Sequence, residues 1–470
     1  MKQLTLLTLI PLILAHCGPP SPGAAEDLQQ AYVANITAHH LCAGTFVVGR
    51  HYQRPINQVL EEDVAPFTAF QWNDGFNFEL DPESRTVTVS GTGFRPRRAR
   101  YHDDQGCTIL PVDGGQIFFH PTALESSLAP ADTLPWPMGD LAAVGEFPEI
   151  DTDALGETLS TAVATPNQHT RAIVVVFKGK ILAESYAPGW NPDTPQISWS
   201  MGKSITSALI GVLVQRGELT LDDPAPIDIW QQPGDPRSAI QIKHLLRMSS
   251  GLGFENLGLQ DGDSYVTANE HMRIYFDSLN VFEHATDQPA EIPPDSQFRY
   301  RNSDPLSLGK IIRDRVEASG DEYLTFPQRA LFDRIGARNF VLETDAWGNF
   351  IMTGYDFGSA RDWARFGLLH LWDGVFAGER ILPEGWVEFV STPAPGDPSQ
   401  GYGGLFWLNR GGSMDRVPED AFWAAGFMGQ RNLIVPSLDL VVVRLGPSGR
   451  GFSSYFNDLV GDVIDLLGGS

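Results

Sequence analysis

Strand-like patterns stand at both ends of the C-terminal two thirds of the chain. Residues 172–177 form an unbroken apolar run rich in β-branched side chains, and residues 181–186 alternate after a Lys-Gly-Lys turn. This pattern predicts a β-hairpin. A second pair of strand-like runs, 432–435 and 440–445, flanks a Pro-Ser-Leu-Asp turn. Helical patterns fill the chain between the two pairs. We therefore expect an α/β (α+β) fold in which strands from both ends meet in one sheet flanked by helices.

The pattern differs upstream, in residues 25–128. Short runs such as 45–48 and 86–90 carry β-branched residues and are followed by turn signals. These runs predict a small β-rich N-terminal domain. A Pro-rich stretch, residues 129–149, is typical of a linker, and we place the domain boundary there. The larger domain then covers residues 150–470.

Composition narrows the class of protein. The chain has 470 residues, 42% of them hydrophobic, which is enough to bury a large core. No apolar run reaches the roughly 18 to 20 residues of a membrane-spanning helix. The 58 acidic residues exceed the 33 basic ones and give a net charge of −25. A surface of this charge repels phosphate, so nucleic acid and anionic lipid are poor partners.

The N-terminus is typical of an export signal. Lys2 precedes an apolar stretch, residues 4–15, and small residues and prolines follow up to residue 23. We expect residues 1–23 to be a signal peptide and tether, and the protein to be periplasmic or secreted. The segment around Cys17 resembles a bacterial lipoprotein signal, although His16 stands where that signal has a small residue. Two outcomes stay open, a lipid anchor on Cys17 or an ordinary cleaved signal.

Export changes the interpretation of the cysteines. With Cys17 in the signal, Cys42 and Cys107 remain as a pair in a segment that would fold in an oxidising compartment. We expect a disulfide between them, which the chain-entropy model values at about 4 kcal/mol for a loop of this length. The alternative is two buried free thiols.

The signatures of several hydrolase classes are absent from the sequence. It has no Gly-x-Ser-x-Gly, no His-Glu-x-x-His and no Gly-rich phosphate loop, so we expect no metal or cofactor. It does contain Ser200-Met201-Gly202-Lys203 at the start of a predicted helix. Residues three apart share one helix face, so the two functional groups can meet there. A buried lysine of lowered pKa can take the proton of a serine and make it a nucleophile.

The same spacing occurs at Ser307 and Lys310, which provides an internal control. There Asp304 is a good N-cap, Pro305 suits the first helical turn, and the following apolar positions form one helix face. We therefore interpret Ser307 as ordinary helix surface or packing. Ser200 differs because it follows a strand-like segment and lies where a helix begins. At that position the positive end of the helix dipole faces it.

Two further segments carry candidate chemistry. Tyr300-Arg301-Asn302 follows one hundred residues after Ser200. A tyrosine beside a Ser/Lys pair can relay a proton to the leaving group, and an asparagine can orient a substrate amide and the lysine. A second Tyr-x-Asn, at residues 455–457, lies in the predicted last helix, and we interpret it as structural. Residues 424–430 precede the late hairpin and border the expected cleft.

Taken together in this order, these segments resemble the serine hydrolases related to class C β-lactamases, with family VIII esterases and 6-aminohexanoate-dimer hydrolases as nearer relatives. The similarity extends over residues 170–467 and includes residues 249–252 and 360–367. It implies a β-lactamase/penicillin-binding-like fold, with an antiparallel sheet flanked by helices and a helical subdomain. It also implies the site residues: Ser200 as nucleophile, Lys203 as general base, Tyr300 as proton relay and Asn302 as orienting residue.

One departure from the family pattern affects the expected substrate. Many β-lactamases and penicillin-binding proteins carry a Lys-Thr-Gly strand whose cation holds a substrate carboxylate, and here the matching positions are Ala424, Ala425 and Gly426. The resemblance therefore implies an esterase or amidase, with the oxyanion held by the backbone N–H groups of Ser200 and Phe427. A β-lactamase or DD-peptidase is the second hypothesis. A penicillin-binding-like sensor that is acylated without turnover is the third.

Overall fold

The computed structural model of the protein describes residues 27–66, 75–254 and 270–468. The predicted leader and Cys17 lie outside these ranges. In the described part of the chain, no helix is both long and apolar enough to cross a membrane.

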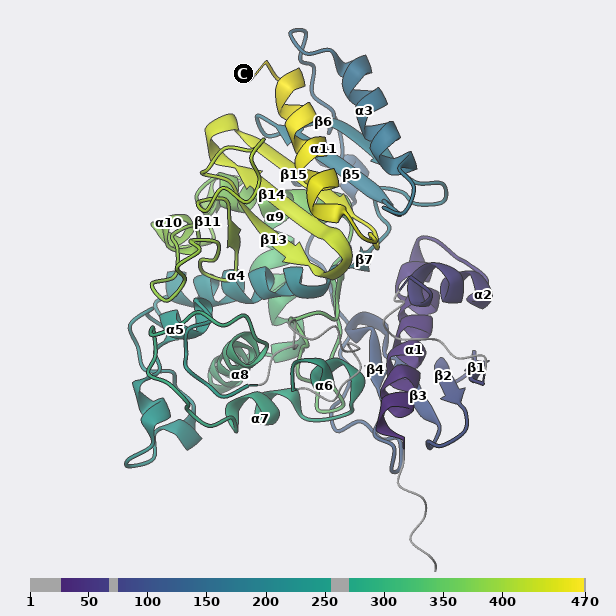
Figure 1. Ribbon diagram of the computed structural model, residues 1–470, viewed down its shortest axis with the longest axis vertical. Coiled ribbons are helices and arrows are strands. Elements are labelled where there is room, and N and C mark those ends of the chain that lie inside the picture. Colours follow the sequence, from purple (N-terminus) through teal and green to yellow (C-terminus); the bar gives the residue numbers. More distant parts are fainter. Residues whose placement is uncertain (1–26, 67–74, 255–269, 469–470) are drawn as a thin grey trace, which may run out of the picture.

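A six-stranded antiparallel sheet forms the upper part of the molecule in Figure 1. Its strands in spatial order are β12 (Trp407–Leu408), β13 (Phe422–Gly426), β14 (Gln430–Val435), β15 (Leu440–Leu445), β5 (Ala172–Phe177) and β6 (Lys180–Tyr186). In the central pair, Val442 on β15 lies opposite Val175 on β5. The two predicted hairpins are thus confirmed, and strands from both ends of the region meet in one sheet.

Helices cover both faces of this sheet (Figure 1). α3 (Thr152–Ala164) and α11 (Phe452–Leu466) pack on one face, and α9 (Ala360–Leu371) packs on the other. All residues of β5 and β15 are buried. Because neither face of these strands meets water, their sequences are unbroken apolar runs rather than alternating ones.

The second layer of the fold is largely helical. Its elements are α4 (Gly202–Gln215), α5 (Ile242–Leu246), α6 (Glu270–Phe276), α7 (Val281–Thr286), α8 (Ser303–Ala318) and α10 (Trp386–Val390). In Figure 1, α4 to α8 lie below the sheet and α10 lies beside it. A small sheet of β7 (Gln196–Ile197), β9 (Asp356–Gly358) and β8 (Val341–Leu342) joins the two layers. A short hairpin is formed by β10 (Val375–Phe376) and β11 (Glu379–Arg380). The arrangement is the one that the resemblance implies, an antiparallel sheet flanked by helices with a helical subdomain.

The N-terminal region contains the predicted sheet and two helices that we did not predict. The sheet has the order β1 (Asn77–Asp81), β2 (Thr86–Ser90), β3 (Arg97–Tyr101) and β4 (Cys107–Ile109). Two helices precede it, α1 (Leu28–Phe46) and the short α2 (Ile56–Val59). The strand expected at 45–48 is wrong, because these residues form the end of α1 and the start of a 3₁₀ turn. α1 is buried on all sides from Ala31 to Gly44, so it shows no amphipathic period.

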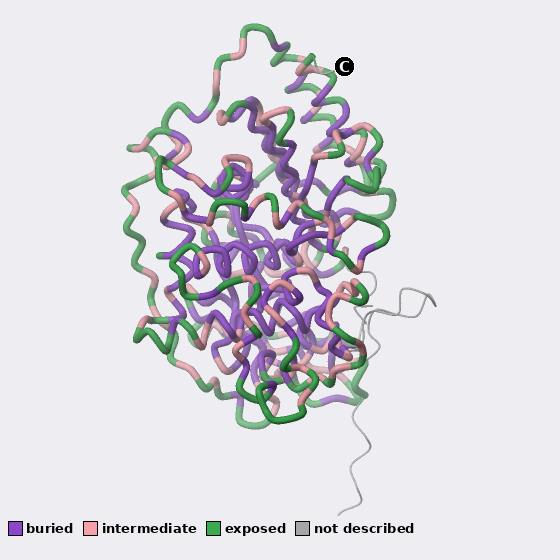
Figure 2. The backbone as a smooth tube through the Cα atoms, turned by 90° about the vertical axis from the view of Figure 1, so that its left-hand side faces the viewer, coloured by how far each residue is buried: buried purple, intermediate pink, exposed green. Residues whose placement is uncertain are grey.

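α1 links the N-terminal sheet to the rest of the protein. A disulfide joins Cys42 on α1 to Cys107 on β4, as predicted. Residues of α1 and of the N-terminal sheet belong to the same continuous hydrophobic cluster as α4 and α8. Figure 2 shows buried backbone through the centre of the molecule and exposed segments at the rim.

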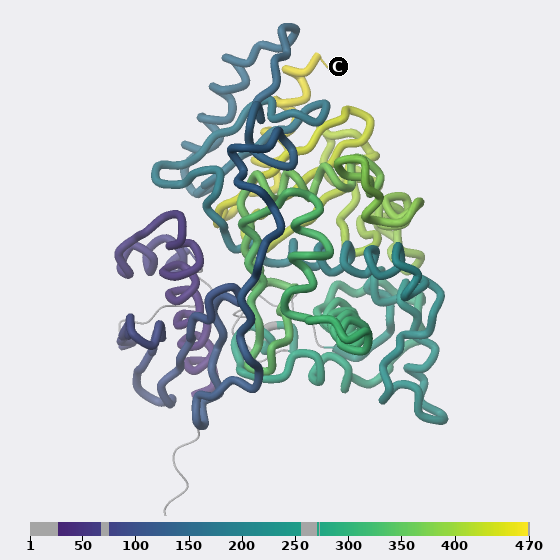
Figure 3. The backbone as a smooth tube through the Cα atoms, turned by 180° about the vertical axis from the view of Figure 1, so that it is seen from behind, coloured from purple at the N-terminus to yellow at the C-terminus, as the bar shows by residue number. Residues whose placement is uncertain are grey.

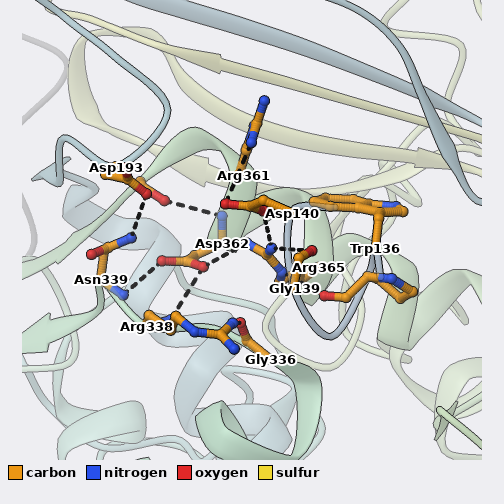
Figure 4. Close-up of polar contacts among 12 residues, drawn as sticks. Trp136, Gly139, Asp140, Asp193, Gly336, Arg338, Asn339, Arg361, Asp362 and Arg365 are labelled. Atoms are coloured by element: carbon orange, nitrogen blue, oxygen red, sulfur yellow. Dashed lines mark hydrogen bonds and ion pairs between the residues drawn. The ribbon is translucent and has the colours of Figure 1, made fainter. Parts of the chain in front are cut away.

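The Pro-rich segment 129–149 is held against the large domain. Figure 3 shows the chain running along the back of the molecule on its way from β4 to α3. Trp136 donates its indole N–H to Gly179 O at 2.9 Å. Arg365 on α9 donates to Pro137 O at 2.7 Å, and its guanidinium lies 4.6 Å from the centroid of the Trp136 ring (Figure 4). Side-chain contacts therefore fix this segment to the large domain.

Candidate active site

Ser200 lies where the small sheet gives way to the central helix. It occupies a 3₁₀ turn, Trp199–Met201, between β7 and α4. Trp199 has a φ of 52°, in the left-handed region, which reverses the chain just before the serine. The predicted context, a strand leading into a helix start, is confirmed. The side chain of Ser200 is half-buried and stands at the N-terminus of α4.

The spacing of three residues brings Ser200 and Lys203 together. Lys203 Nζ lies 2.9 Å from Ser200 Oγ and donates to Thr353 O at 3.0 Å. Lys203 is fully buried, and this burial lowers its pKa to about 7, although the carboxyl of Asp356 acts in the opposite direction. A substantial fraction of Lys203 is therefore neutral at neutral pH and can accept a proton.

Tyr300 completes the group around the serine. Its hydroxyl forms a hydrogen bond with the side chain of Ser200, and Lys203 Nζ lies 5.1 Å from the centroid of its ring. Burial raises the pKa of Tyr300 to about 12, against the lowering effects of the Ser200 hydrogen bond and the charge of Arg431. The tyrosine is thus a proton donor at neutral pH, whereas the lysine can be a base.

Asn302 is connected to the site through Tyr275. Its Nδ2 donates to Tyr275 OH and to His271 O, both at 3.2 Å. It therefore reaches Lys203 only through Tyr275, whose hydroxyl donates to Thr353 O at 2.5 Å. Through the Tyr275 hydroxyl, Asn302 is thus linked to the Thr353 carbonyl that Lys203 also contacts.

Tyr275 and Thr353 are parts of the site that the sequence analysis missed. Tyr275 belongs to α6, and Thr353 precedes β9. Neither residue falls in a recognisable motif, and Thr353 contributes a backbone carbonyl, for which side-chain identity gives no signal.

Gly426 and Phe427 border the nucleophile from the large sheet. A Cβ on Gly426 would lie 2.0 Å from Ser198 O, so only glycine lets β13 approach the turn this closely. Phe427 follows directly, is 37% exposed, and packs edge-on against Trp199 with ring centroids 5.7 Å apart. The end of β13 therefore lies beside the turn that carries Ser200.

A cation lies next to the two alanines of β13. Ala424 is buried, and Ala425 lies opposite Arg431 in the β13–β14 pair. Arg431 donates to Gly426 O at 3.3 Å and to Gln430 O at 2.8 Å, and among the described residues no carboxylate forms an ion pair with it. Burial lowers the pKa of Arg431 to about 10, and the guanidinium stays charged at neutral pH.

The second copies of the motifs are structural. Ser307 is fully buried within α8, and Lys310 pairs with Asp314 at 2.9 Å. Tyr455 lies in α11 and donates to Ala162 O at 3.0 Å. The N-cap assigned to Asp304 is wrong. α8 begins at Ser303, and Asp304 is buried inside the first turn, where it accepts a hydrogen bond from Ser250 Oγ at 2.8 Å.

The segment 360–367 also has a structural place. It forms most of α9, where Asp362 accepts hydrogen bonds from the backbone N–H groups of Arg338 and Asn339. Figure 4 shows Asp362 and Arg365 in one polar network with Asp140. The described residues contain no group of three or more His, Cys, Asp or Glu side chains that could hold a metal ion.

Comparison with known proteins identifies the family. Residues 159–449 match the family model described as Beta-lactamase. The 6-aminohexanoate-dimer hydrolase of Paenarthrobacter ureafaciens is 25% identical over 321 residues, which are 63% of this chain and 79% of that protein.

Solved structures share the fold. A putative 6-aminohexanoate-dimer hydrolase from Bacillus anthracis has a TM-score of 0.55 at 20% identity and covers 74% of this chain and 88% of its own. A family VIII carboxylesterase has a TM-score of 0.51 at 14% identity and covers 67% and 97%. Since the family model covers more than half of the sequence, the chain belongs to the Beta-lactamase family of serine hydrolases.

Proposed function

We propose that the protein cleaves small esters or linear amides through an acyl-enzyme on Ser200. The observation that carries this proposal is the position of Ser200 Oγ, 2.9 Å from Lys203 Nζ and hydrogen-bonded to Tyr300. The pKa of the lysine is lowered to about 7 and that of the tyrosine is raised to about 12. At neutral pH, a lysine of lowered pKa can act as a base and a tyrosine of raised pKa can act as an acid.

The reaction follows from these positions. Lys203 takes the proton of Ser200 as Oγ attacks the carbonyl carbon of the substrate, and the carbonyl oxygen becomes an oxyanion. The N–H groups of Ser200 and Phe427 hold this oxyanion, and loss of one such donor typically costs about 10² to 10³ in rate. The proton passes through Tyr300 to the leaving alcohol or amine as its bond to the carbonyl carbon breaks. Water then attacks the acyl-enzyme by the same proton path and releases the acid.

The chemistry of the cleft favours an uncharged substrate. Ala424 and Ala425 stand where a Lys-Thr pair would hold a carboxylate, and Phe427 presents an exposed apolar ring beside Ser200. The names of two similar proteins agree with the cleavage of linear amides and esters, since one is a 6-aminohexanoate-dimer hydrolase and another a carboxylesterase.

One observation favours a second candidate. Arg431 lies opposite Ala425 and affects the pKa of Tyr300, so it can supply the missing cation from the neighbouring strand. A β-lactamase or DD-peptidase, whose substrates carry a carboxylate, remains the alternative for this reason.

Burst kinetics with a chromogenic ester test the proposal. Purified protein should release p-nitrophenol from short p-nitrophenyl esters in a steady state that continues long after one equivalent. A stoichiometric burst without a steady state would instead support the sensor hypothesis. Intact-mass spectrometry after a fluorophosphonate probe, with peptide mapping, should place one adduct on Ser200. Labelling of another serine would overturn the proposal.

We also propose that the chain is exported. The leader in residues 1–23 supports this, as does the Cys42–Cys107 disulfide, because such bonds persist in oxidising compartments. Cell fractionation and the mass of the mature N-terminus test it. A lipid-modified Cys17 at the N-terminus would establish an anchor, and recovery of the unprocessed chain from the cytoplasm would contradict export.

A further inference from the structure

Helix α1 lies outside the matched residues 159–449, yet it touches the walls of the candidate active site. Asn35 Nδ2 donates to Phe276 O, at the end of α6, over 2.6 Å. The ring of His39 stacks on that of Tyr355 with centroids 3.7 Å apart. The ring of His40 packs edge-on against Trp199, the residue before the nucleophile, at 5.5 Å. α1 is therefore in contact with three segments that surround Ser200.

These contacts converge on Tyr275. Tyr355 donates its hydroxyl to Tyr275 O at 2.7 Å, and the two rings lie 5.3 Å apart. Tyr275 precedes Phe276, which α1 holds through Asn35. Its ring also packs edge-on against Trp199 at 5.9 Å. α1 therefore contacts both the helix that carries Tyr275 and the tyrosine that bonds to the Tyr275 carbonyl.

The Tyr275 hydroxyl shares an acceptor with the candidate general base. It donates to Thr353 O at 2.5 Å, and Lys203 Nζ donates to the same oxygen at 3.0 Å. Burial raises the pKa of Tyr275, so the hydroxyl keeps its proton. A carbonyl stabilises a charged ammonium more than a neutral amine. A second donor on that carbonyl draws electron density away and weakens this preference.

We propose that Tyr275 is a positioning residue for Lys203, held in place by α1, so that the N-terminal region is part of the hydrolase's catalytic scaffold. Tyr275 fixes the Thr353 carbonyl and limits how strongly that carbonyl favours the protonated lysine. This inference rests on the proposed function, in which Lys203 is the base. It assigns a role to a helix that the family match does not cover.

Other titratable groups also face Lys203 and bear on its protonation. The buried carboxyl of Asp356 on β9 raises the pKa of the lysine. His271 on α6 is buried, and its own pKa is lowered to about 3, so it is neutral wherever the enzyme would be assayed. The ring of Tyr300 lies against the ammonium group. None of these three side chains is removed by Tyr275→Phe, so a change in the lysine's protonation can be assigned to the lost hydroxyl.

The pH dependence of ester hydrolysis by Tyr275→Phe tests the proposal. Without the Tyr275 hydroxyl, Thr353 O keeps only Lys203 and the long contact from Ser200 Oγ at 3.4 Å, and it should stabilise the protonated lysine more strongly. The apparent pKa at which kcat/KM falls on the acidic side of the profile should then rise by about 0.5 to 1 pH unit. A shift of this size corresponds to one ordinary hydrogen bond. At pH 6 the variant should be about three- to tenfold slower than the wild type, and at pH 9 the two should converge. A merely structural role would lower the rate equally at every pH.

The matched control is Tyr323→Phe. Tyr323 is buried, and its hydroxyl also bonds to the backbone, accepting from the N–H of Phe350 at 3.3 Å. Its removal should leave the acidic limb in place. An unmoved limb in Tyr275→Phe, or an equal shift in both variants, would overturn the inference.

A second pair of variants tests the part played by α1. Asn35→Ala removes the hydrogen bond to Phe276 O and should lower kcat by about three- to tenfold with little change in KM. Leu28→Ala changes a residue of the same helix that is 54% exposed and should have no effect. Unchanged kcat in Asn35→Ala would contradict the scaffold role even if Tyr275→Phe failed to fold. Full activity in Lys203→Ala would instead refute the proposed function, so the two failures are distinguishable.

Discussion

His39 and Glu343 lie 304 positions apart in the sequence, and their side chains meet at 2.5 Å between Nε2 and Oε2. Both are fully buried. Burial lowers the pKa of His39 to about 3 and raises that of Glu343 well above its usual value. The pair is therefore neutral, with a proton on the carboxyl. The other oxygen of Glu343 accepts the backbone N–H of Cys107 at 2.7 Å, so one side chain ties together α1, β4 and the end of β8.

Glu343→Gln should preserve these contacts and change their pH dependence. The amide can accept from Cys107 N–H and donate to a neutral His39. Because burial raises the folded-state pKa of Glu343 above its ordinary value of 4.5, wild-type stability falls as pH rises from 4.5 towards the folded-state pKa. Glutamine does not titrate. As pH rises from 4.5 to 8, the melting temperature of the variant should thus increase relative to that of the wild type.

Glu343→Leu is the contrasting variant. It leaves the Cys107 N–H and His39 without their partner and should cost about 2 to 4 kcal/mol of unfolding free energy. Equal melting temperatures for the Gln and Leu variants would show that the pair contributes nothing specific.

The nucleophile assignment predicts different outcomes for the two Ser-x-x-Lys motifs. Ser200→Ala should abolish ester turnover while the melting temperature stays near that of the wild type. Ser307→Ala should leave kcat/KM unchanged, because Ser307 Oγ is buried in α8 without a hydrogen-bond partner. Steady-state kinetics and thermal melts of both variants measure this. Comparable loss of activity in both would contradict the assignment.

The lowered pKa of Lys203 predicts the pH profile of the reaction. A base must be neutral to accept a proton, and the pKa of Lys203 is lowered to about 7. The value of kcat/KM should rise tenfold per pH unit below pH 7 and level off above it. Lys203→Ala should lower kcat by about 10² to 10⁴, and Lys310→Ala, which breaks only a partly exposed pair with Asp314, should not. A profile that is flat from pH 5 to 9 would argue against lysine as the base.

The alanines at the Lys-Thr positions predict discrimination against carboxylates. A charge-assisted hydrogen bond to a substrate carboxylate contributes about 1.5 to 3 kcal/mol, so its loss should cost roughly ten- to a hundredfold. Short neutral p-nitrophenyl esters should therefore have a much higher kcat/KM than nitrocefin. Efficient nitrocefin turnover would favour the β-lactamase alternative.

Arg431→Gln separates the two candidates further. If the esterase assignment is correct, the variant should hydrolyse neutral and carboxylate-bearing esters with the same ratio of kcat/KM as the wild type. A selective loss of about tenfold or more for the carboxylate-bearing ester would show that Arg431 replaces the missing cation.

The disulfide predicts a loss of stability on reduction. In the chain-entropy model, opening the loop from Cys42 to Cys107 costs about 4 kcal/mol. Reduction, or the double change Cys42→Ala and Cys107→Ala, should lower the melting temperature, and we expect the N-terminal region to unfold first. Non-reducing peptide mapping of protein recovered from outside the cytoplasm should find the bond. Free thiols on both residues there would contradict this prediction.

Local patterns were sufficient for part of the fold. The strands at 172–177 and 440–445 are buried on both faces, so their apolar runs identify them without any tertiary information. The contact between Ser200 and Lys203 is likewise local, because a helical turn brings residues three apart onto one face. Tyr300, Gly426 and Phe427 were placed through the family resemblance rather than through their spacing.

Tertiary structure decided the rest. α1 was not predicted, because a helix enclosed by protein on every side has no polar face and hence no period. Asp304 looked like an N-cap, but its partner Ser250 comes from a distant segment. Tyr275 meets Thr353 across 78 residues of sequence, and His39 meets Glu343 across 304. The sequence by itself determined which elements form and which serine faces which lysine, since both depend on neighbours along the chain. The surroundings that set the pKa of that lysine depend on burial and on carbonyls from remote segments, which only the packed chain brings together.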